Sequence, residues 1–119
     1  MKIIGHQLNG KNIATVKGDA PIVRDVESAI DLIGNVYYLG YDALVLHEAD
    51  FVPDFFVLKT KLAGEVLQKF NNYRVRLAIV GDWSEVDSSS LRDFIRESNA
   101  GRIVFFANSE QEAMNRLAE

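Results

Sequence analysis

Two short polar segments contain the side chains of this sequence that could carry out chemistry. His47 and Glu48 directly follow one apolar run, Asp82 and Trp83 closely follow another, and Asp54 stands near the first pair. Two or three carboxylates and an imidazole could bind a divalent metal ion or act as acid and base. An adjacent indole could cover a bound ligand. These five residues are therefore the candidate site that the sequence offers.

The two apolar runs have the composition of buried parallel strands. Residues 43–46 (ALVL) and 76–80 (RLAIV) flank residues 53–70, which show helical periodicity. A strand–helix–strand unit of this kind forms a parallel crossover and brings the carboxyl ends of both strands to one edge of the sheet. Ligand sites of open α/β sheets usually lie at that edge, so we expect the candidate residues to meet there, with Asp54 at the start of the connecting helix.

A second interpretation of the same residues is structural. Their spacing matches no metal-binding motif, and Asp and Glu commonly begin loops and cap helices. On this interpretation Asp82 caps a turn, His47 forms a local hydrogen bond, and Trp83 packs over the end of the sheet. The sequence contains no cysteine, no glycine-rich nucleotide loop and no nucleophile-elbow serine. We therefore expect no catalytic residue, cofactor or metal ion on the strength of a motif.

The other elements alternate along the chain. Asn9 and Gly10 separate two apolar stretches and predict a β-hairpin, because Asn-Gly readily adopts the positive φ angles of a type I′ turn. A first helix is expected to start near residues 19–21 (DAP) and to end at Gly40. Later segments predict helices at residues 53–70, 87–101 and 109–117, and a strand at residues 102–107. The predicted fold class is α/β: an N-terminal β-hairpin followed by αβαβαβα, with a mainly parallel sheet.

Apolar spacing within the first two helices predicts their buried faces. The first helix has apolar residues at intervals of three and four, namely Ile22, Val26, Ile30, Ile33 and Tyr37. The second has a double apolar row, which should cover most of one sheet face: Phe55, Phe56, Leu58, Leu62, Ala63, Val66, Leu67 and Phe70. Gly64 interrupts this helix at a cost of about 1 kcal/mol relative to alanine, which indicates close packing against a neighbouring element.

Composition restricts the class of protein. The 119 residues are 48% hydrophobic, so we expect a single folded α/β domain over residues 1–119. The 17 acidic and 13 basic residues give a net charge of −4, and the basic residues are scattered along the chain, which argues against nucleic acid as a partner. No apolar run is long enough to cross a membrane, and no signal segment follows Met1, so we expect a cytoplasmic location without membrane binding.

The predicted order of elements, closed by residues 108–113 (NSEQEA), resembles the STAS fold of anti-sigma-factor antagonists. The resemblance covers the layout of nearly the whole chain and implies a regulatory protein. Those antagonists carry a phosphorylatable serine at the start of the second helix, after a loop that ends in aspartate. Asp54 stands at about that place and is followed by Phe55 and Phe56, so the resemblance does not carry over a serine-phosphorylation switch.

The sequence is also similar to a bacterial family of short single-domain proteins of unassigned function. The similarity lies in residues 45–48 (VLHE), 53–56 (PDFF), 62–65 (LAGE), 67–70 (LQKF), 72–75 (NYRV), 78–82 (AIVGD) and 91–95 (LRDFI). This second resemblance covers more specific residues than the first, but it implies no activity.

Together these observations favour a non-catalytic cytoplasmic regulatory or protein-interaction domain. The alternative is a small enzyme, or a ligand- or metal-binding protein, that uses His47, Glu48 and Asp82 at the carboxyl edge of the sheet. The candidate partners are another protein and a second copy of this chain. For a homodimer, the hairpin would supply an edge strand with apolar residues 3–4 and 13–14 at the contact.

Overall fold

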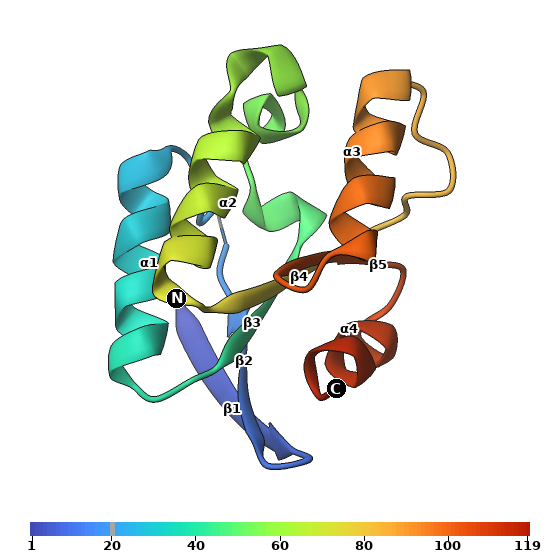
Figure 1. The fold of residues 1–119 in the computed structure, drawn as a ribbon. Helices are drawn as coiled ribbons and strands as arrows, with labels where there is room; N and C mark the ends of the chain where they lie inside the picture. Colours follow the sequence, from blue (N-terminus) through green and yellow to red (C-terminus); the bar gives the residue numbers. More distant parts are fainter. Residues whose placement is uncertain (20) are drawn as a thin grey trace.

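The computed structural model of the protein describes residues 1–19 and 21–119. Its five-stranded sheet has the strands in the order in which they occur in the chain (Figure 1). They are β1 (Lys2–Leu8), β2 (Lys11–Lys17), β3 (Ala43–His47), β4 (Arg76–Val80) and β5 (Val104–Ala107). β1 pairs antiparallel with β2, and all other neighbouring strands are parallel. The predicted fold class, an α/β domain with an N-terminal hairpin and a mainly parallel sheet, is confirmed.

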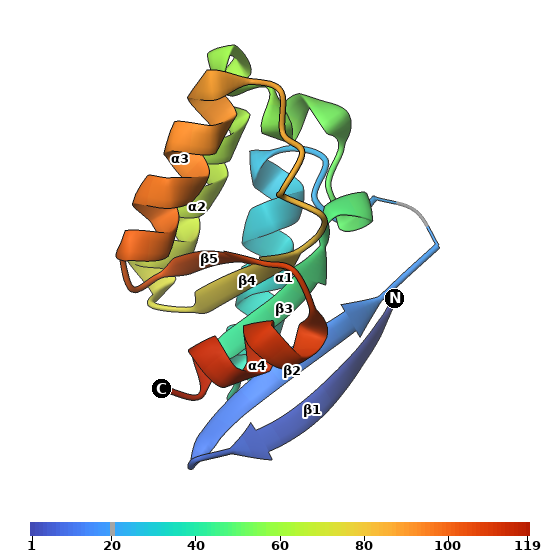
Figure 2. The ribbon, with the colours of Figure 1, turned by 90° about the vertical axis from the view of Figure 1, so that its right-hand side faces the viewer.

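Helices cover the two faces of the sheet unequally. The α-helices are α1 (Val26–Tyr38), α2 (Leu62–Tyr73), α3 (Ser89–Ala100) and α4 (Glu110–Leu117). Each of α1, α2 and α3 connects two adjacent parallel strands, and right-handed crossovers in one direction place all three on the same face. The short helix α4 lies alone on the opposite face (Figure 2). No helix among the described residues is both long and apolar enough to span a bilayer.

The N-terminal hairpin forms as the sequence predicts. Asn9 and Gly10 have φ angles of 53° and 77°, so both residues of the turn are left-handed, as a type I′ turn requires. Gly5 on β1 lies against the phenol ring of Tyr41, and a Cβ at this position would collide with the ring. β1 is therefore an edge strand that is held to the sheet by β2 and packed against Tyr41.

The first helix begins later than predicted. Asp25 is its N-cap: the carboxylate accepts from the Ser28 N–H at 2.7 Å, and the Ser28 hydroxyl oxygen accepts from the Asp25 N–H at 3.1 Å. Asp19 and Pro21 precede the helix, and Ala20, also part of the predicted start, lies outside the described residues. This reciprocal cap satisfies the backbone N–H groups of Ser28 and Asp25, so it stabilises a helix that starts directly after Asp25.

Long-range backbone bonds explain the late start of α1. The N–H groups of Ile22 and Val23 donate to the carbonyl of Asp50 at 2.7 and 2.9 Å, so these residues run beside the segment that follows β3. Because α1 starts after Asp25, the residues that face the sheet differ from those expected for a helix that includes Ile22. The buried residues of α1 are Ala29, Leu32, Ile33 and Val36. Tyr37, which was expected on this face, is 60% exposed.

The predicted helix over residues 53–70 is interrupted. Its first half forms two 3₁₀ helices, η2 (Pro53–Phe56) and η3 (Leu58–Thr60), which follow a third, η1 (Glu48–Asp50). Lys61 has a left-handed φ of 66°, and α2 starts only after it. The change of direction places Phe55 in the core while leaving Leu58 and Leu62 half-buried.

Gly64 does not have the packing role that was expected of it. It is exposed on α2, and a Cβ at this position would meet no heavy atom within 4 Å. The expectation was wrong because Ala63 and Val66, not Gly64, lie on the buried side of this helix. The glycine is therefore a tolerated helix interruption.

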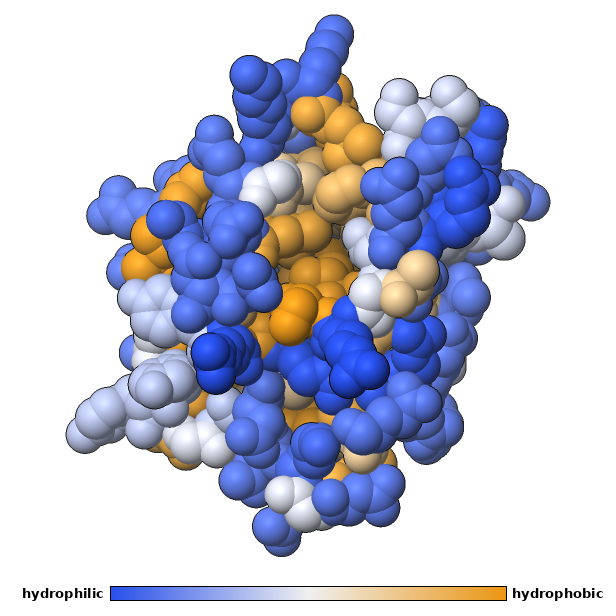
Figure 3. Space-filling view, in the orientation of Figure 1, coloured by the Kyte–Doolittle hydropathy of each residue, from blue (hydrophilic) through white to orange (hydrophobic). Residues whose placement is uncertain are grey.

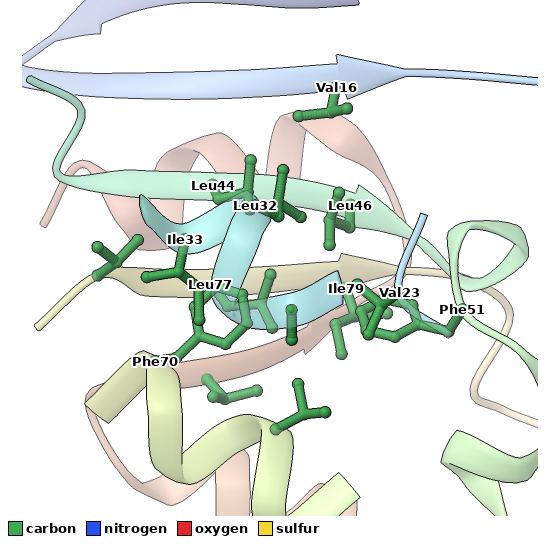
Figure 4. Packing of buried hydrophobic residues seen from close by; sticks show 14 of the residues in the cluster. Val16, Val23, Leu32, Ile33, Leu44, Leu46, Phe51, Phe70, Leu77 and Ile79 are labelled. Carbon is green, nitrogen blue, oxygen red and sulfur yellow. The ribbon is translucent and has the colours of Figure 1, made fainter. Parts of the chain in front are cut away.

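Two hydrophobic cores flank the sheet. The larger lies beneath α1 and α2, where strand residues such as Leu44, Leu77 and Ile79 meet Ile33 and Phe70 (Figure 4). The smaller lies beneath α4 and is rich in alanine, with Ile13, Ala43, Val45, Ala78, Phe105, Ala107, Ala113, Leu117 and Ala118. Each fully buried large aliphatic or aromatic side chain contributes about 1.5–3 kcal/mol, so the larger core supplies most of the hydrophobic stabilisation.

The predicted capping box of α4 forms in a modified way. The Ser109 hydroxyl oxygen accepts from the N–H of Glu112 at 3.1 Å, as the motif requires. The Glu112 carboxylate, however, accepts from the N–H of Asn108 at 3.3 Å rather than from that of Ser109. The helix therefore starts at the predicted residue, directly after the carboxyl end of β5.

Candidate functional site

The predicted site residues lie around the carboxyl ends of β3 and β4. His47 is the last residue of β3, and Glu48 follows in η1. The Glu48 side chain lies against Gly81 at the end of β4, since its Oε1 is 3.0 Å from the place of a Cβ there. Asp82 directly follows Gly81, whereas Asp54 is exposed in η2. The fold thus brings His47 and Glu48 to the same edge as Asp82, as expected from a parallel crossover between the two strands.

His47 lies between two carboxylates that the sequence did not identify as site residues. Its Nε2 is 3.0 Å from Glu110 Oε1, at the start of α4, and its Nδ1 is 3.8 Å from Asp50 Oδ2. The same Asp50 oxygen accepts the backbone N–H of His47 at 2.7 Å. Asp50 is buried, whereas the side chains of His47 and Glu110 are 38% and 53% exposed. Only the His47–Glu110 pair is therefore readily accessible to a ligand.

A sequence signal existed for one of these two carboxylates. Asp50 stands three residues after His47, which is the spacing of a tight turn closed by a side chain. Glu110 is 63 residues away from His47 along the chain, and its approach depends on how α4 folds back across the sheet. The sequence indicates that Glu110 begins a helix but contains no signal for its partner.

Asp82 forms a closed turn with Ser84. Its Oδ1 accepts from the Ser84 hydroxyl at 2.7 Å and from the Ser84 N–H at 3.3 Å. The hydroxyl, followed by the backbone N–H, lowers the pKa of the Asp82 carboxyl group below its ordinary value. These bonds stabilise the ionised form, so Asp82 is a turn-forming carboxylate within its own segment.

Trp83 is fixed over the carboxyl ends of β4 and β5. Its indole Nε1–H lies 2.9 Å from the carbonyl oxygen of Ala107 and 3.2 Å from that of Ile79. Its ring packs near Phe56 and Phe106, with centroid distances of 5.7 and 5.0 Å. These contacts satisfy the indole donor and bury much of its ring, so the side chain closes the end of the sheet.

A cavity of about 600 Å³ opens beside His47 and Glu48. Its lining consists of His47, Glu48, Ala49, Phe51, Pro53, Phe56 and Val80. This set offers one imidazole, one carboxylate and an apolar wall, and it contains no hydroxyl, amide or cationic side chain. Among the side chains of this lining, the imidazole of His47 is the one group that could donate a hydrogen bond to a developing negative charge. Within residues 1–19 and 21–119, no three His, Asp or Glu side chains are grouped as metal ligands.

A second concave region lies between α2 and α3. This groove, hereafter the α2–α3 groove, has a volume of about 370 Å³ and apolar lining residues that include Leu67, Phe94, Ile103 and Val104. Figure 3 shows it as a hollow with a hydrophobic floor between two polar ridges. The helical periodicity of α2 and α3 indicates which face of each meets the sheet, but not the spacing between the two helices. The sequence therefore did not predict the groove.

Comparison with known proteins assigns a family but no activity. Residues 8–117 match the family described as Domain of unknown function (DUF4180), and the chain therefore belongs to this family. The expected membership of a family of unassigned function is thereby confirmed. No curated protein and no solved structure is similar enough to the chain to count as a match.

Proposed function

We propose that this protein is a non-catalytic regulatory or protein-interaction domain that binds a partner protein through the α2–α3 groove. The observation that carries the proposal is the exposed apolar floor of this groove on the face that α1, α2 and α3 otherwise cover. Leu67, Phe94 and Ile103 are each only partly buried there. An apolar groove between two helices is a common docking place for the apolar face of a peptide or helix.

The groove rim favours an uncharged apolar segment as the occupant. Gln68 and Asn71 on α2 and Ser98 on α3 are neutral, and only Glu97 and Arg102 carry charge. Neutral amides can satisfy polar groups at the margin of an interface without the desolvation cost of a charge. The partner segment is therefore expected to present an apolar stripe in its centre and neutral polar groups beside it.

Affinity capture with a pair of glycine variants tests this proposal. Gly64 lines the groove, whereas Gly34 lies on α1, and a Cβ at either position would meet nothing within 4 Å. Gly64→Lys places a long charged side chain at the groove without removing a core contact, and Gly34→Lys is the matched control. The parent and both variants are immobilised, exposed to extract of the native cell, and compared by mass spectrometry of the retained proteins.

A partner retained by the parent and by Gly34→Lys but lost with Gly64→Lys supports the proposal. In binding assays with the purified proteins, this partner should then bind the parent and Gly34→Lys with similar affinity and Gly64→Lys more weakly. Retention of the same proteins by all three chains, or of none by the parent, contradicts docking in the groove. Circular dichroism and thermal melting of the variants establish that each is folded.

The regulatory part of the proposal includes a STAS-like layout and a cytoplasmic location. The sequential αβ order after a hairpin supports the layout, and a chain without cysteine functions without disulfides, as cytoplasmic proteins do. Asp54, at about the place of the antagonists' serine, is exposed at the start of η2 and carries no hydroxyl. Regulation would therefore proceed without phosphorylation at this position, and cell fractionation tests the location.

The cavity beside His47 supports a second candidate function, the binding of a small ligand at the carboxyl edge. The accessible His47–Glu110 pair, 3.0 Å apart, is the observation that favours it. A thermal-shift screen of divalent metals, nucleotides and small acids tests it, because a bound ligand raises the melting temperature by mass action. A shift that His47→Ala abolishes supports this function. Asp82→Ala is the matched control, since Asp82 does not line the cavity.

A homodimer through the free edge of β1 is a further proposal about partners. β1 leaves one edge unpaired within the described chain, and Ile3 and Ile4 on it are only partly buried. Ile13 and Ala14, also expected at the contact, are fully buried in β2 between β1 and β3, so that part of the expectation was wrong. A strict monomer by light scattering at high micromolar concentration would exclude this dimer.

A further inference from the structure

Four arginines converge on one pocket at the opposite, amino edge of the sheet. The pocket has a volume of about 840 Å³, within the usual range for small-molecule sites, and is lined by Arg74, Arg76, Arg102 and Arg116. These residues come from the end of α2, the start of β4, the segment before β5 and the last turn of α4. In a chain with net charge −4, such a concentration of positive charge requires an explanation.

Two of the four arginines hold the ends of helices. Arg76 donates from Nη1 to the carbonyl of Leu117 at 3.0 Å and from Nε to that of Arg102 at 2.9 Å. Arg116 donates to the carbonyl of Asn99 at 3.0 Å, and its guanidinium lies 4.0 Å from the centroid of the Phe105 ring. Cations at helix carboxyl ends offset the partial negative charge of the terminal carbonyls. Arg76 and Arg116 therefore have a structural explanation.

The other two arginines have none. Among the described residues, the side chains of Arg74 and Arg102 form no hydrogen bond or ion pair, and both residues are exposed. Arg74 ends α2 in a left-handed conformation, with φ of 57°, which commits its backbone to the cap. Their guanidinium groups remain available to a ligand in the pocket.

The charges on the pocket wall leave a positive excess. The carboxyl ends of α2, α3 and α4 meet there, and at roughly half a negative charge each they supply about one and a half charges. The Glu119 carboxylate, 3.4 Å from Arg116, adds one more. Four guanidinium groups therefore exceed these charges by roughly one to two. Burial lowers the pKa of Arg76, and the neighbouring Arg116 and Arg102 lower it further, against an opposing effect of Glu119.

We propose that this pocket binds a small phosphorylated molecule, whose phosphate is held by Arg74 and Arg102. The excess charge matches a phosphate monoester, and guanidinium forks from separate segments match a tetrahedral group better than a planar carboxylate, which one fork can satisfy. Asn71 and Asn72 add amide groups to the lining, and the half-buried Ile103 offers an apolar surface to the organic part. This site goes beyond the proposed docking role.

Titration of the purified protein with phosphate compounds tests the proposal without any partner protein. Inorganic phosphate, phenyl phosphate and benzoate are added to ¹⁵N-labelled protein, and chloride at equal ionic strength is the control. We expect saturable shifts of the amide resonances of residues 71–76 and 101–103. Phenyl phosphate should bind more tightly than inorganic phosphate, because its ring can contact Ile103. Equal or tighter binding of benzoate would overturn the assignment to phosphate.

Charge-removing variants locate the site. Arg74→Gln or Arg102→Gln should each weaken phenyl phosphate binding about tenfold, the effect of losing a hydrogen bond to a charged group. Arg96→Gln is the control, because Arg96 pairs with Asp93 on the exposed side of α3 and doesn't line the pocket. Glu119→Gln should strengthen binding. Absence of saturable shifts at millimolar phosphate, or unchanged binding in the Arg74→Gln, Arg102→Gln double variant, would overturn the proposal.

Discussion

At the carboxyl edge of the sheet, several polar side chains bind close neighbours in the chain, whereas at the amino edge the arginines converge from four separate segments. Asp50 binds a residue three positions away and Asp82 a residue two positions away. The arginines of the amino edge span positions 74 to 116. The first edge carries mainly carboxylates and an imidazole, and the second carries guanidinium groups.

The difference separates local structure from sites that the fold assembles. Short polar runs after strands satisfy one another within a turn or two, which leaves few of their groups for a ligand. Of the side chains that the fold assembles at the amino edge, Arg76 and Arg116 bind helix-end carbonyls, whereas Arg74 and Arg102 have no partner among the described residues and keep their hydrogen-bonding capacity. The polar side chains at the carboxyl edge are conspicuous in the sequence, but most of their hydrogen bonds stabilise local structure. The amino edge is less conspicuous, yet it holds two arginines that are free to bind a ligand.

The largest expected effect tests the structural nature of the carboxyl edge. Trp83→Ala should lower the free energy of unfolding by about 3 kcal/mol, because it removes the ring contacts with Phe56 and Phe106 and the donor to Ala107. Trp83→Phe keeps an aromatic ring but loses the donor and should cost about 1 kcal/mol. Urea unfolding measures both. Parental stability of Trp83→Ala would contradict a structural role for the indole at this edge.

At the amino edge, the comparison predicts two classes of arginine. Arg76→Met should cost about 2 kcal/mol, because the terminal carbonyls of α4 lose their donors, and amide exchange in that turn should accelerate. Arg102→Met should stay within about 0.5 kcal/mol of the parent, since its side chain has no partner in the described chain. A larger loss of stability for Arg102→Met than for Arg76→Met would mean that Arg102 is the structural arginine and Arg76 the one available to a ligand.

Gly64, on α2 between the two edges, provides a control substitution that should increase the free energy of unfolding instead of decreasing it. Gly64→Ala should raise stability by up to about 1 kcal/mol, because an alanine in an open helix position restricts only the unfolded chain. Gly34→Ala on α1, with equally open surroundings, should behave alike. Melting temperatures measure both changes. Destabilisation by Gly64→Ala alone would indicate that α2 packs more closely against a neighbour.

The accessible contact between His47 and Glu110 at the carboxyl edge should contribute little to stability. Glu110→Gln is expected to change the free energy of unfolding by no more than about 0.5 kcal/mol, since both side chains are more than one-third exposed. A double-mutant cycle with His47→Ala measures the coupling directly. A coupling well above 1 kcal/mol would make this pair a structural element of the edge rather than a group open to ligands.

The smallest effect concerns the turn at Asp82. The lowered pKa of this carboxyl group means that its stabilising contribution is complete above the unfolded-state pKa and is lost as the pH falls through the folded-state pKa. Ser84→Ala should raise the pKa of Asp82 towards its ordinary value, as measured by NMR titration of the side chain. The pKa of Asp25, lowered by Ser28, should not change in that variant. A constant Asp82 pKa would contradict the Ser84 contacts.

Local signals predicted most elements of the fold. Asn9 and Gly10 specify a turn by their own φ preferences, and the apolar runs of β3 and β4 specify buried strands. The start of α1 depended instead on bonds from Ile22 and Val23 to Asp50, and the sequence of residues 19–21 contains no information about that distant partner. Similarly, the helical periodicity of residues 53–70 is continuous in the sequence, but the left-handed conformation of Lys61 interrupts the helix in the structure.

The candidate sites differ in the same way. The placement of His47 at the end of β3 followed from the strand alone, but its approach to Glu110 required the position of α4 on the sheet. Arg74 and Arg102 belong to segments on either side of α3, so only the pairing of β4 with β5 brings them to one pocket. Along the chain they resemble ordinary solvated cations.

The agreement of strand order with chain order has a consequence for biosynthesis. Each strand that leaves the ribosome after the hairpin can pair at once with the strand made just before it, so the sheet can grow by addition at one edge. Its second face, however, stays uncovered until α4 is made, after all five strands. Nascent chains that stall after β5 would expose Ile13, Val45 and Phe105 and would be prone to aggregate. Once α4 has left the ribosome, it covers these residues.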